Sequence, residues 1–300
     1  MTGSLSTLGL IVVTYSPGPP LDRLLDSLPS AFSRPVPVVL ADNGSTDGSV
    51  QRAAARPGVR VVETGGNLGY GRAANAGVQA VESGGEAPEF VLICNPDIVF
   101  GADSLDALLA AADRWPQAAA FGPLIKTPDG RIYPSARDLP SIGRGIGHAL
   151  CGWWWPSNPW TRAYRRQDER AAERVAGWLS GACLMVRRTA FDDIGGFDPR
   201  YFMYFEDVDL GDRLGRAGWQ NVLVPTATVV HTGGHATERT PALMAAEHHR
   251  SAYRYLADRY SRWWQAPLRA ALRAGLAARA ALARRSAAVS AGAALPDERR

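Results

Sequence analysis

The chain has 300 residues, of which 46% are hydrophobic, enough for one large domain with a buried core and short appendages. Its 33 basic and 29 acidic side chains give a formal net charge of +4, too small to indicate a nucleic-acid partner by itself. The 3 cysteines are widely spaced without a Cys-x-x-Cys pair, so neither a disulfide framework nor a zinc site is favoured, and a reducing compartment fits.

Short apolar runs alternate with helix-compatible segments from residue 8 to about residue 124. This alternation predicts βαβ units in a mainly parallel, Rossmann-like α/β sheet. The first run lacks a preceding basic region, so it is interpreted as a strand rather than a signal peptide. The expected strands are 8–14, 36–40, 59–62, 90–94 and 118–121, and the expected helices are 21–28, 48–55, 69–81 and 104–114.

Polar residues follow the ends of several expected strands, where ligands bind in parallel sheets. Thr14, Asp42, residues 64–67 and residues 95–97 should therefore line one crevice. Asn95 and Asp97 are two apart on an extended chain, so both can face one hard cation or one polar ligand. The alternative for residues 95–97 is a turn that merely closes the strand.

Two loops at these ends have a further interpretation. Asp42 begins a Gly/Ser/Thr/Asp loop that could be ordinary βα-turn material, or its carboxylate could accept the ring N–H of a pyrimidine base. The glycine-rich loop 65–75 opens a helix and could bring backbone N–H groups to a phosphate. The loop also matches the G-x-G-x-x-A dinucleotide pattern, but a dinucleotide site is disfavoured. The loop follows the third expected strand, and the next strand end with an acidic residue lies beyond the usual spacing of about 20 residues.

The regular alternation stops after residue 124. A stretch rich in Trp, Pro, Gly and Arg follows, and its Trp153, Trp154 and Trp155 could serve core packing, sugar binding or lipid contact. Residues 175–188 are expected to form a strand whose glycines admit close approach of a ligand.

A run of aromatic residues then precedes Glu206 and Asp207, which begin a helix expected to end near residue 216. Acids in a first helical turn often only complement the helix dipole, but at a pocket they also suit a general base. Short strands are expected at 222–224 and 228–230, and the second leads into His231, which alone would more often be structural.

The C-terminal region combines Trp263 and Trp264 with a predicted helix at 267–288 that is rich in Ala, Leu and Arg. Its leucines fall mostly on one side with arginines beside them, so the amphipathic pattern is imperfect. Docking on an anionic membrane and a solvated helical extension both remain open. No segment reaches the roughly 18 apolar residues of a membrane span, so a soluble or peripheral protein is expected.

These features in this order resemble the inverting, metal-dependent glycosyltransferases of family 2, which have the GT-A fold. The resemblance extends from the first strand to about residue 256 and rests on residues 14–15, 42–47, 95–97 and 206–207. It implies a glycosyltransferase domain at 1–260, with a nucleotide-sugar-binding half at about 8–124 and an acceptor and catalytic half at 125–260. Residues 261–300 would form a basic helical tail.

The resemblance also implies roles for individual residues. Asp207 would be the catalytic base, with Glu206 beside it. Asp97 and His231 would bind Mg²⁺ or Mn²⁺, and Asn95 stands where an aspartate is commoner. The residues implied to bind the nucleotide sugar are Thr14, Tyr15, Asp42, Asn43, Asn67, Gly69, Arg72, Asn75 and Asn95. The residues implied to bind the acceptor are Trp178, Ser180, Gly181 and Asp209.

Further motifs at 39–48, 67–71, 133–137, 178–181 and 201–214 are similar to those of the actinobacterial rhamnosyltransferases that build the cell-wall linkage unit. That similarity implies transfer of L-rhamnose from dTDP-β-L-rhamnose to the 3-hydroxyl of GlcNAc on decaprenyl diphosphate. It also implies a cytoplasmic enzyme associated peripherally with the inner face of the plasma membrane. The alternatives are a family 2 enzyme with another donor or acceptor, a nucleotidyltransferase, and a non-catalytic sugar-nucleotide-binding protein.

Overall fold

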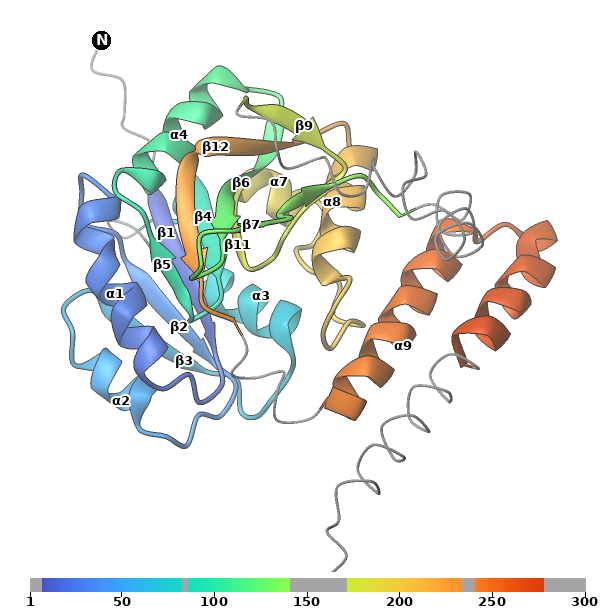
Figure 1. The fold of residues 1–300 in the computed structure, drawn as a ribbon, viewed down its shortest axis with the longest axis horizontal. Coiled ribbons are helices and arrows are strands. Elements are labelled where there is room, and N and C mark those ends of the chain that lie inside the picture. Colours follow the sequence, from blue (N-terminus) through green and yellow to red (C-terminus); the bar gives the residue numbers. More distant parts are fainter. Residues whose placement is uncertain (1–6, 83–85, 141–171, 234–240, 278–300) are drawn as a thin grey trace, which may run out of the picture.

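The computed structural model describes residues 7–82, 86–140, 172–233 and 241–277. In this part of the chain a central sheet lies between helices, as Figure 1 shows. Its first four strands are parallel in the order β3-β2-β1-β4, so the predicted α/β fold with a mainly parallel sheet is confirmed. The expected early strands all form, as β1 (Leu8–Thr14), β2 (Val38–Asp42), β3 (Val59–Glu63), β4 (Phe90–Cys94) and β6 (Ala118–Lys126).

The second half of the sheet is mixed. β11 (Cys183–Arg187) inserts between β4 and β6 and is antiparallel to both. β12 (Gln220–His231) runs parallel to β6, and β5 (Ile98–Phe100) pairs with β12 in antiparallel register at the edge of the main strand order. The remaining strands are short: β7 (Ile132–Tyr133), β8 (Ala136–Arg137), β9 (Arg174–Ala176) and β10 (Trp178–Leu179).

Helices cover both faces of the sheet because the central strands are apolar on both faces. In β1, Leu10 and Val12 belong to one buried cluster, whereas Ile11 and Val13 belong to the other. Such strands read as continuous apolar runs in sequence. The first cluster is covered by α1 (Pro19–Ala31), α2 (Ser49–Ala54) and α4 (Ser104–Arg114), and the second by α3 (Tyr70–Ala80), α7 (Arg188–Asp193) and α8 (Glu206–Arg216).

The sequence-based boundaries were wrong in the second half. The single strand expected at 175–188 is divided into β9, β10 and β11 followed by α7, because glycines at 177 and 181 interrupt it. A Cβ on Gly177 would lie 2.5 Å from the Leu139 nitrogen, so another segment packs directly on its backbone. The two strands expected at 222–224 and 228–230 are one strand, β12, with a register shift between Val224 and Thr228. β5 and α7 were not predicted.

The chain continues into helices beside the sheet (Figure 1). α9 (Pro241–Arg259) packs through Tyr255 against Tyr201 and Val208 in a third apolar cluster. A 3₁₀ turn (Trp263–Gln265) follows, and residues 266–277 are helical, which confirms the described part of the predicted tail helix. Residues 278–288 of that prediction and Trp153 to Trp155 lie outside the described residues. None of the helices within the described ranges is long and apolar enough to span a membrane.

The close contact between Gly69 and the backbone of Phe202 can be tested by substitution. The φ of Gly69 is +87°, and a Cβ there would lie 2.1 Å from the backbone oxygen of Phe202. We expect Gly69→Ala to lower the free energy of unfolding by about 2–4 kcal/mol, since left-handed strain adds to overpacking. Gly58→Ala is the control, because φ is +78° there but nothing lies within 4 Å, so only the strain remains. Equal losses of unfolding free energy for the two variants, measured by urea unfolding, would contradict a tight contact between Gly69 and Phe202.

Candidate active site

A cavity of about 360 Å³ lies where the carboxyl ends of β1 and β4 meet the segment before α8. This position agrees with the rule for parallel sheets. Most of the sequence-predicted site residues line it, although they come from distant parts of the chain. Those lining it are Thr14, Tyr15, Asn43, Asn67, Gly69, Asn95, Asp97, Ser180, Gly181, Glu206, Asp207 and His231.

Asp97 and His231 form one polar wall of the cavity. The β5–β12 pairing places His231 opposite Ile98, so its Nε2 lies 3.2 Å from Asp97 Oδ1 and 3.3 Å from the Asn95 amide nitrogen. Burial by itself would raise the pKa of Asp97, but the hydrogen bond and charge interaction with His231 outweigh burial and the pKa is lowered. Asp97 is therefore held as a carboxylate that faces the pocket.

The glycine-rich loop is braced within the protein. Leu68 N–H donates to Asn43 Oδ1 at 3.2 Å, and Gly69 N–H donates to Asn67 Oδ1 at 3.1 Å. Tyr70 N–H donates to the Phe202 carbonyl at 3.1 Å. These three N–H groups already have acceptors within the protein, and phosphate binding by the loop stays a prediction. The loop fixes the wall of the cavity.

Asp42 lies at the end of β2, outside the cavity lining. It accepts hydrogen bonds from Thr14 Oγ1 at 2.7 Å, from Ser45 Oγ at 2.5 Å and from Ser45 N–H at 2.9 Å. A carboxylate offers about four acceptor positions, so one remains for a ligand. Its role toward a base stays a prediction, and its visible role is to order the loop after β2.

Glu206 and Asp207 open α8 and line the same cavity. Gly181 N–H donates to Asp207 Oδ2 at 2.9 Å, and Val208 N–H donates to Oδ1 at 2.8 Å. Burial raises the pKa of Asp207 and outweighs these bonds. Burial and then the neighbouring Asp207 charge raise the pKa of Glu206 as well, and Glu206 Oε2 has no partner in the described part of the chain. Two adjacent buried acids therefore hold protons more tightly than exposed ones.

A strained turn presents these acids to the cavity. Tyr204 and Phe205 both adopt left-handed backbone, with φ of 67° and 65°, which non-glycine residues rarely do. Contacts from α9 hold the turn. Ser251 Oγ donates to the Met203 carbonyl at 2.9 Å, and the centroid of the His248 ring lies 5.4 Å from the ring centroids of both Tyr204 and Phe205. The strain is thus supported by tertiary contacts next to the acids.

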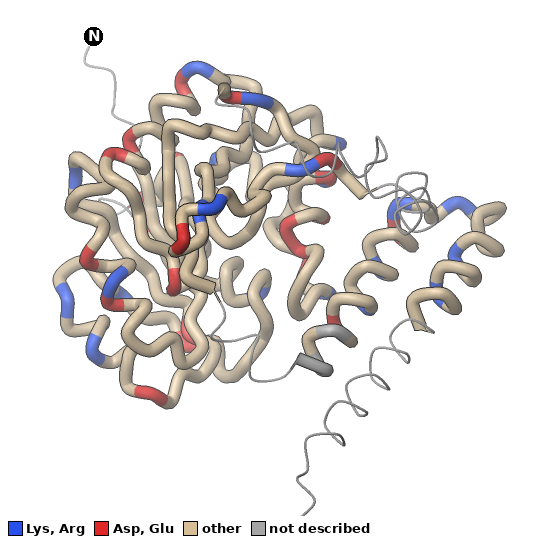
Figure 2. The backbone as a smooth tube through the Cα atoms, in the orientation of Figure 1, with Lys and Arg blue, Asp and Glu red and all other residues tan. Residues whose placement is uncertain are grey.

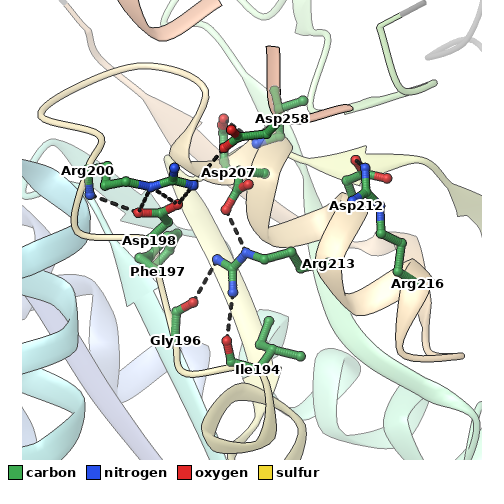
Figure 3. A network of polar contacts seen from close by, with 12 residues as sticks. Ile194, Gly196, Phe197, Asp198, Arg200, Asp207, Asp212, Arg213, Arg216 and Asp258 are labelled. Carbon is green, nitrogen blue, oxygen red and sulfur yellow. Dashed lines mark hydrogen bonds and ion pairs between the residues drawn. The ribbon is translucent and has the colours of Figure 1, made fainter. Parts of the chain in front are cut away.

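Arginine side chains hold the surrounding loops, as Figure 3 shows. Arg213 of α8 donates to the carbonyls of Ile194 and Gly196 at 2.9 and 2.7 Å. Arg200 pairs with Asp198 and with Asp258 of α9, both at 2.6 Å. The loop between α7 and α8 is therefore tied to both α8 and α9.

Several predicted site residues support the fold instead of lining the cavity. Asn75 exchanges hydrogen bonds with the backbone of Phe197 at 2.8 and 2.9 Å. Arg72 donates to the Pro199 carbonyl, Trp178 donates to the Asp138 carbonyl, and Asp209 pairs with Arg213. The structure does not bring these side chains to the lining, so their assigned ligand contacts stay predictions without its support.

The lining residues without a role in the sequence analysis include the four large side chains of Tyr70, Tyr133, Met203 and Tyr204. Tyr133 contacts the His231 ring edge-on, with centroids 6.1 Å apart. Tyr70 belongs to the glycine-rich loop, and Met203 and Tyr204 belong to the aromatic run before Glu206. Proximity to those motifs was the available signal, but composition alone does not distinguish a lining aromatic from a core one.

Comparison with known proteins decides the family. The model for glycosyl transferase family 2 matches residues 10–195, and the model for glycosyl transferase family group 2 matches residues 160–287. The N-acetylglucosaminyl-diphospho-decaprenol L-rhamnosyltransferase of Mycobacterium tuberculosis is 57% identical over 286 residues, 93% of each chain. The chain belongs to glycosyl transferase family 2. The rhamnosyltransferase WbbL of Escherichia coli (strain K12) is a further relative, 26% identical over 83% of this chain and 92% of its own.

Solved structures agree on the fold of this family 2 glycosyltransferase. The mannosyltransferase PcManGT of Pyrobaculum calidifontis, solved with GDP-Man and Mn²⁺, superposes with a TM-score of 0.56. The match covers 96% of this chain and 81% of that one at 20% sequence identity. At that identity the likeness shows a shared fold, so the predicted GT-A architecture is confirmed.

The raised pKa of Glu206 predicts a pH dependence of stability. Above its ordinary value of 4.5 the residue is ionised in the unfolded chain but still protonated in the folded enzyme, so stability falls as pH rises toward the folded pKa. The glutamine side chain in the Glu206→Gln variant cannot titrate. We therefore expect the melting temperature of the variant, relative to that of the wild type, to increase from about pH 5 to about pH 8. The control is Glu63→Gln at the exposed end of β3. A difference that does not change with pH would refute the prediction.

Proposed function

We propose that this glycosyltransferase transfers L-rhamnose from dTDP-β-L-rhamnose to the 3-hydroxyl of GlcNAc on decaprenyl diphosphate, with inversion. The observation that carries the proposal is the 57% identity to the Mycobacterium tuberculosis rhamnosyltransferase across 93% of both chains. The geometry supports it, because one cavity contains an ionised Asp97 on one wall and the buried pair Glu206 and Asp207 on the other.

Asp207 is the proposed general base. Its carboxylate faces the cavity and removes the proton from the acceptor hydroxyl as that oxygen bonds to the anomeric carbon of the donor. The bond from that carbon to the diphosphate breaks, and dTDP leaves with the electron pair. Attack and departure on opposite faces of the sugar ring give inversion. The raised pKa of Asp207 makes it a stronger base than an exposed aspartate.

The donor nucleotide is proposed to lie along the ends of β1 and β2. Thr14, Asn43 and Asn67 line the cavity there, and Tyr15 is 49% exposed. A ring with that exposure can cover a planar base with its face. In this arrangement the diphosphate points toward Asp97, and the sugar occupies the space between Asp97 and Asp207.

A divalent ion fits the donor set of the first wall. Asp97 offers a carboxylate oxygen and His231 a ring nitrogen, 3.2 Å apart, so both converge on one point. No three or more His, Cys, Asp or Glu residues gather at a point within the described ranges, so Asp97 and His231 would hold the ion and leave its other positions to non-protein ligands, as is common for Mg²⁺. Bound Mg²⁺ or Mn²⁺ would neutralise the charge that develops on the departing diphosphate.

The region after α9 is proposed to dock on the membrane that contains the lipid acceptor. Trp263 is 85% exposed and Trp264 is 56% exposed, and aromatic residues of this kind favour the lipid interface. Figure 2 shows basic residues along the helix that follows. Arg269 and Arg273 belong to this helix, and such side chains attract anionic lipid by about 1 kcal/mol each.

The test of the function is an assay with dTDP-β-L-rhamnose and a GlcNAc-diphosphopolyprenol acceptor. We expect release of dTDP, a product heavier than the acceptor by one rhamnosyl unit, loss of both in excess EDTA and recovery with Mg²⁺ or Mn²⁺. Asp207→Asn should lower turnover about 10²- to 10⁴-fold while calorimetry shows nearly unchanged donor affinity. Asp193→Asn, an exposed acid in α7, is the matched control.

Each alternative gives a different result in this assay. Release of pyrophosphate would indicate a nucleotidyltransferase, and donor binding without turnover would indicate a binding protein. Product formation from a different sugar nucleotide only would correct the donor. Near-normal turnover of Asp207→Asn would move the base to Glu206 or Asp209, and full activity in EDTA would exclude a required metal.

The membrane proposal predicts that Trp263→Ala/Trp264→Ala reduces sedimentation with anionic vesicles and slows transfer to a long-chain acceptor. Transfer to a short, soluble acceptor analogue should stay unchanged, because the exposed rings lie outside the cavity lining. Val175→Ala, 49% exposed on β9, controls for loss of a surface apolar group. Unchanged vesicle binding, or equal loss on both acceptors, would contradict docking by this pair. Deletion of residues 262–300 should give the same pattern.

A further inference from the structure

The backbone of Gly181 connects two helices that approach the cavity from different parts of the chain. Its N–H, in the peptide shared with Ser180, donates to Asp207 Oδ2 at 2.9 Å, at the start of α8. Its carbonyl, in the peptide shared with Ala182, accepts the hydroxyl of Tyr70 at 2.5 Å, at the start of α3. Both backbone polar groups of Gly181 are therefore engaged, one by the proposed base and one by a tyrosine.

The Gly181 bond is the contact that orients Asp207 from outside its own helix. The other oxygen, Oδ1, accepts the N–H of Val208, the next residue along α8. A hydrogen bond from the neighbouring residue turns with the helix and cannot fix the carboxylate relative to the opposite wall. The direction of the Gly181 N–H therefore decides where Oδ2 points.

Tyr70 is held independently of Gly181. Its backbone N–H donates to the Phe202 carbonyl at 3.1 Å, and its ring meets Phe197 edge-on with centroids 6.0 Å apart. A Cβ on Gly181 would lie 3.5 Å from Tyr70 Cε1 and 3.3 Å from Asp207 Cβ, so the three residues are in contact. The tyrosine hydroxyl is thus a fixed donor against which the Gly181 peptide is set.

We propose that Tyr70 is a positioning residue for the catalytic step: its hydroxyl holds the Gly181 carbonyl and so restrains the backbone of Gly181, whose N–H on the preceding peptide bonds to Asp207. This inference rests on the proposed function, in which Asp207 is the base. Tyr70 takes no proton in the reaction. It acts through Gly181 on the direction and proton affinity of the Asp207 carboxylate.

The hydrogen bond from Gly181 favours the ionised form of Asp207 and opposes the effect of burial on its pKa. Removing the tyrosine hydroxyl leaves the Gly181 carbonyl without this donor, so the backbone at Gly181 can rotate about φ and ψ and the bond from its N–H to Asp207 weakens. The pKa of Asp207 then rises further. Less of the base is ionised at a given acidic pH, and the acidic limb of the kcat profile moves to higher pH.

The experiment measures kcat and donor KM of Tyr70→Phe from about pH 5 to about pH 9, where base ionisation limits the rate. We expect kcat to fall about tenfold on the acidic limb, as for one lost buried hydrogen bond, and to recover most of the wild-type value at high pH. Donor KM should stay within about twofold, because the ring and backbone that line the cavity remain.

Tyr201→Phe is the matched control. Tyr201 is 0% exposed and its hydroxyl has no hydrogen-bond partner among the described residues, so removal should leave the profile of the wild type. An unshifted acidic limb, or a uniform drop in kcat at every pH, in Tyr70→Phe would overturn the positioning role. The profile is recorded with whichever sugar nucleotide the wild type uses, so an incorrect donor does not affect the result. A wild-type chain that transfers no sugar overturns both proposals.

Discussion

The short segment 180–182 is the constraint on which the site depends. Gly181 N–H holds Asp207, and the Ala182 carbonyl accepts the N–H of Asn95, the first residue of the motif that contains Asp97. The Ser180 N–H in turn donates to the Ser135 carbonyl at 2.8 Å. One backbone stretch therefore connects Asp207 with the motif that contains Asp97.

That stretch can occupy this place because β11 breaks the parallel order of the sheet. β11 lies antiparallel to β4, with Cys183 opposite Cys94, so the residues before β11 meet the residues after β4. An all-parallel sheet would have put the beginning of this strand at the opposite edge. The same principle explains His231, which reaches Asp97 because β12 is antiparallel to β5.

The energetic consequence is concentrated at the start of α8. Glu206 is buried and Asp207 is half-buried, and the turn before them holds two non-glycine residues in left-handed backbone. Each feature costs stability by itself. Contacts from α9 to Met203, Tyr204 and Phe205 compensate, so a helix outside the sandwich of sheet and helices supports the turn that leads into the two acids.

The sequence by itself determined the first half of the fold and identified most of the residues that line the cavity. Apolar runs of strand length alternate with helical periods up to about residue 124, and local pattern is sufficient where strands follow in βαβ order. Acids and amides at strand ends, with Glu206 and Asp207 after an aromatic run, indicated a glycosyltransferase of family 2. Most of those residues line the cavity.

Tertiary structure alone decided which polar residues face the ligand and which brace the fold. Asp42 and Asn75 look like ligand-binding residues in sequence, yet their side chains bond to segments distant in the chain. Tyr70 looks like one aromatic among many, yet its hydroxyl donates to the Gly181 carbonyl beside Asp207. The physical reason is that hydrogen-bond partners distant in sequence depend on strand order and register, and local periodicity contains no information about either.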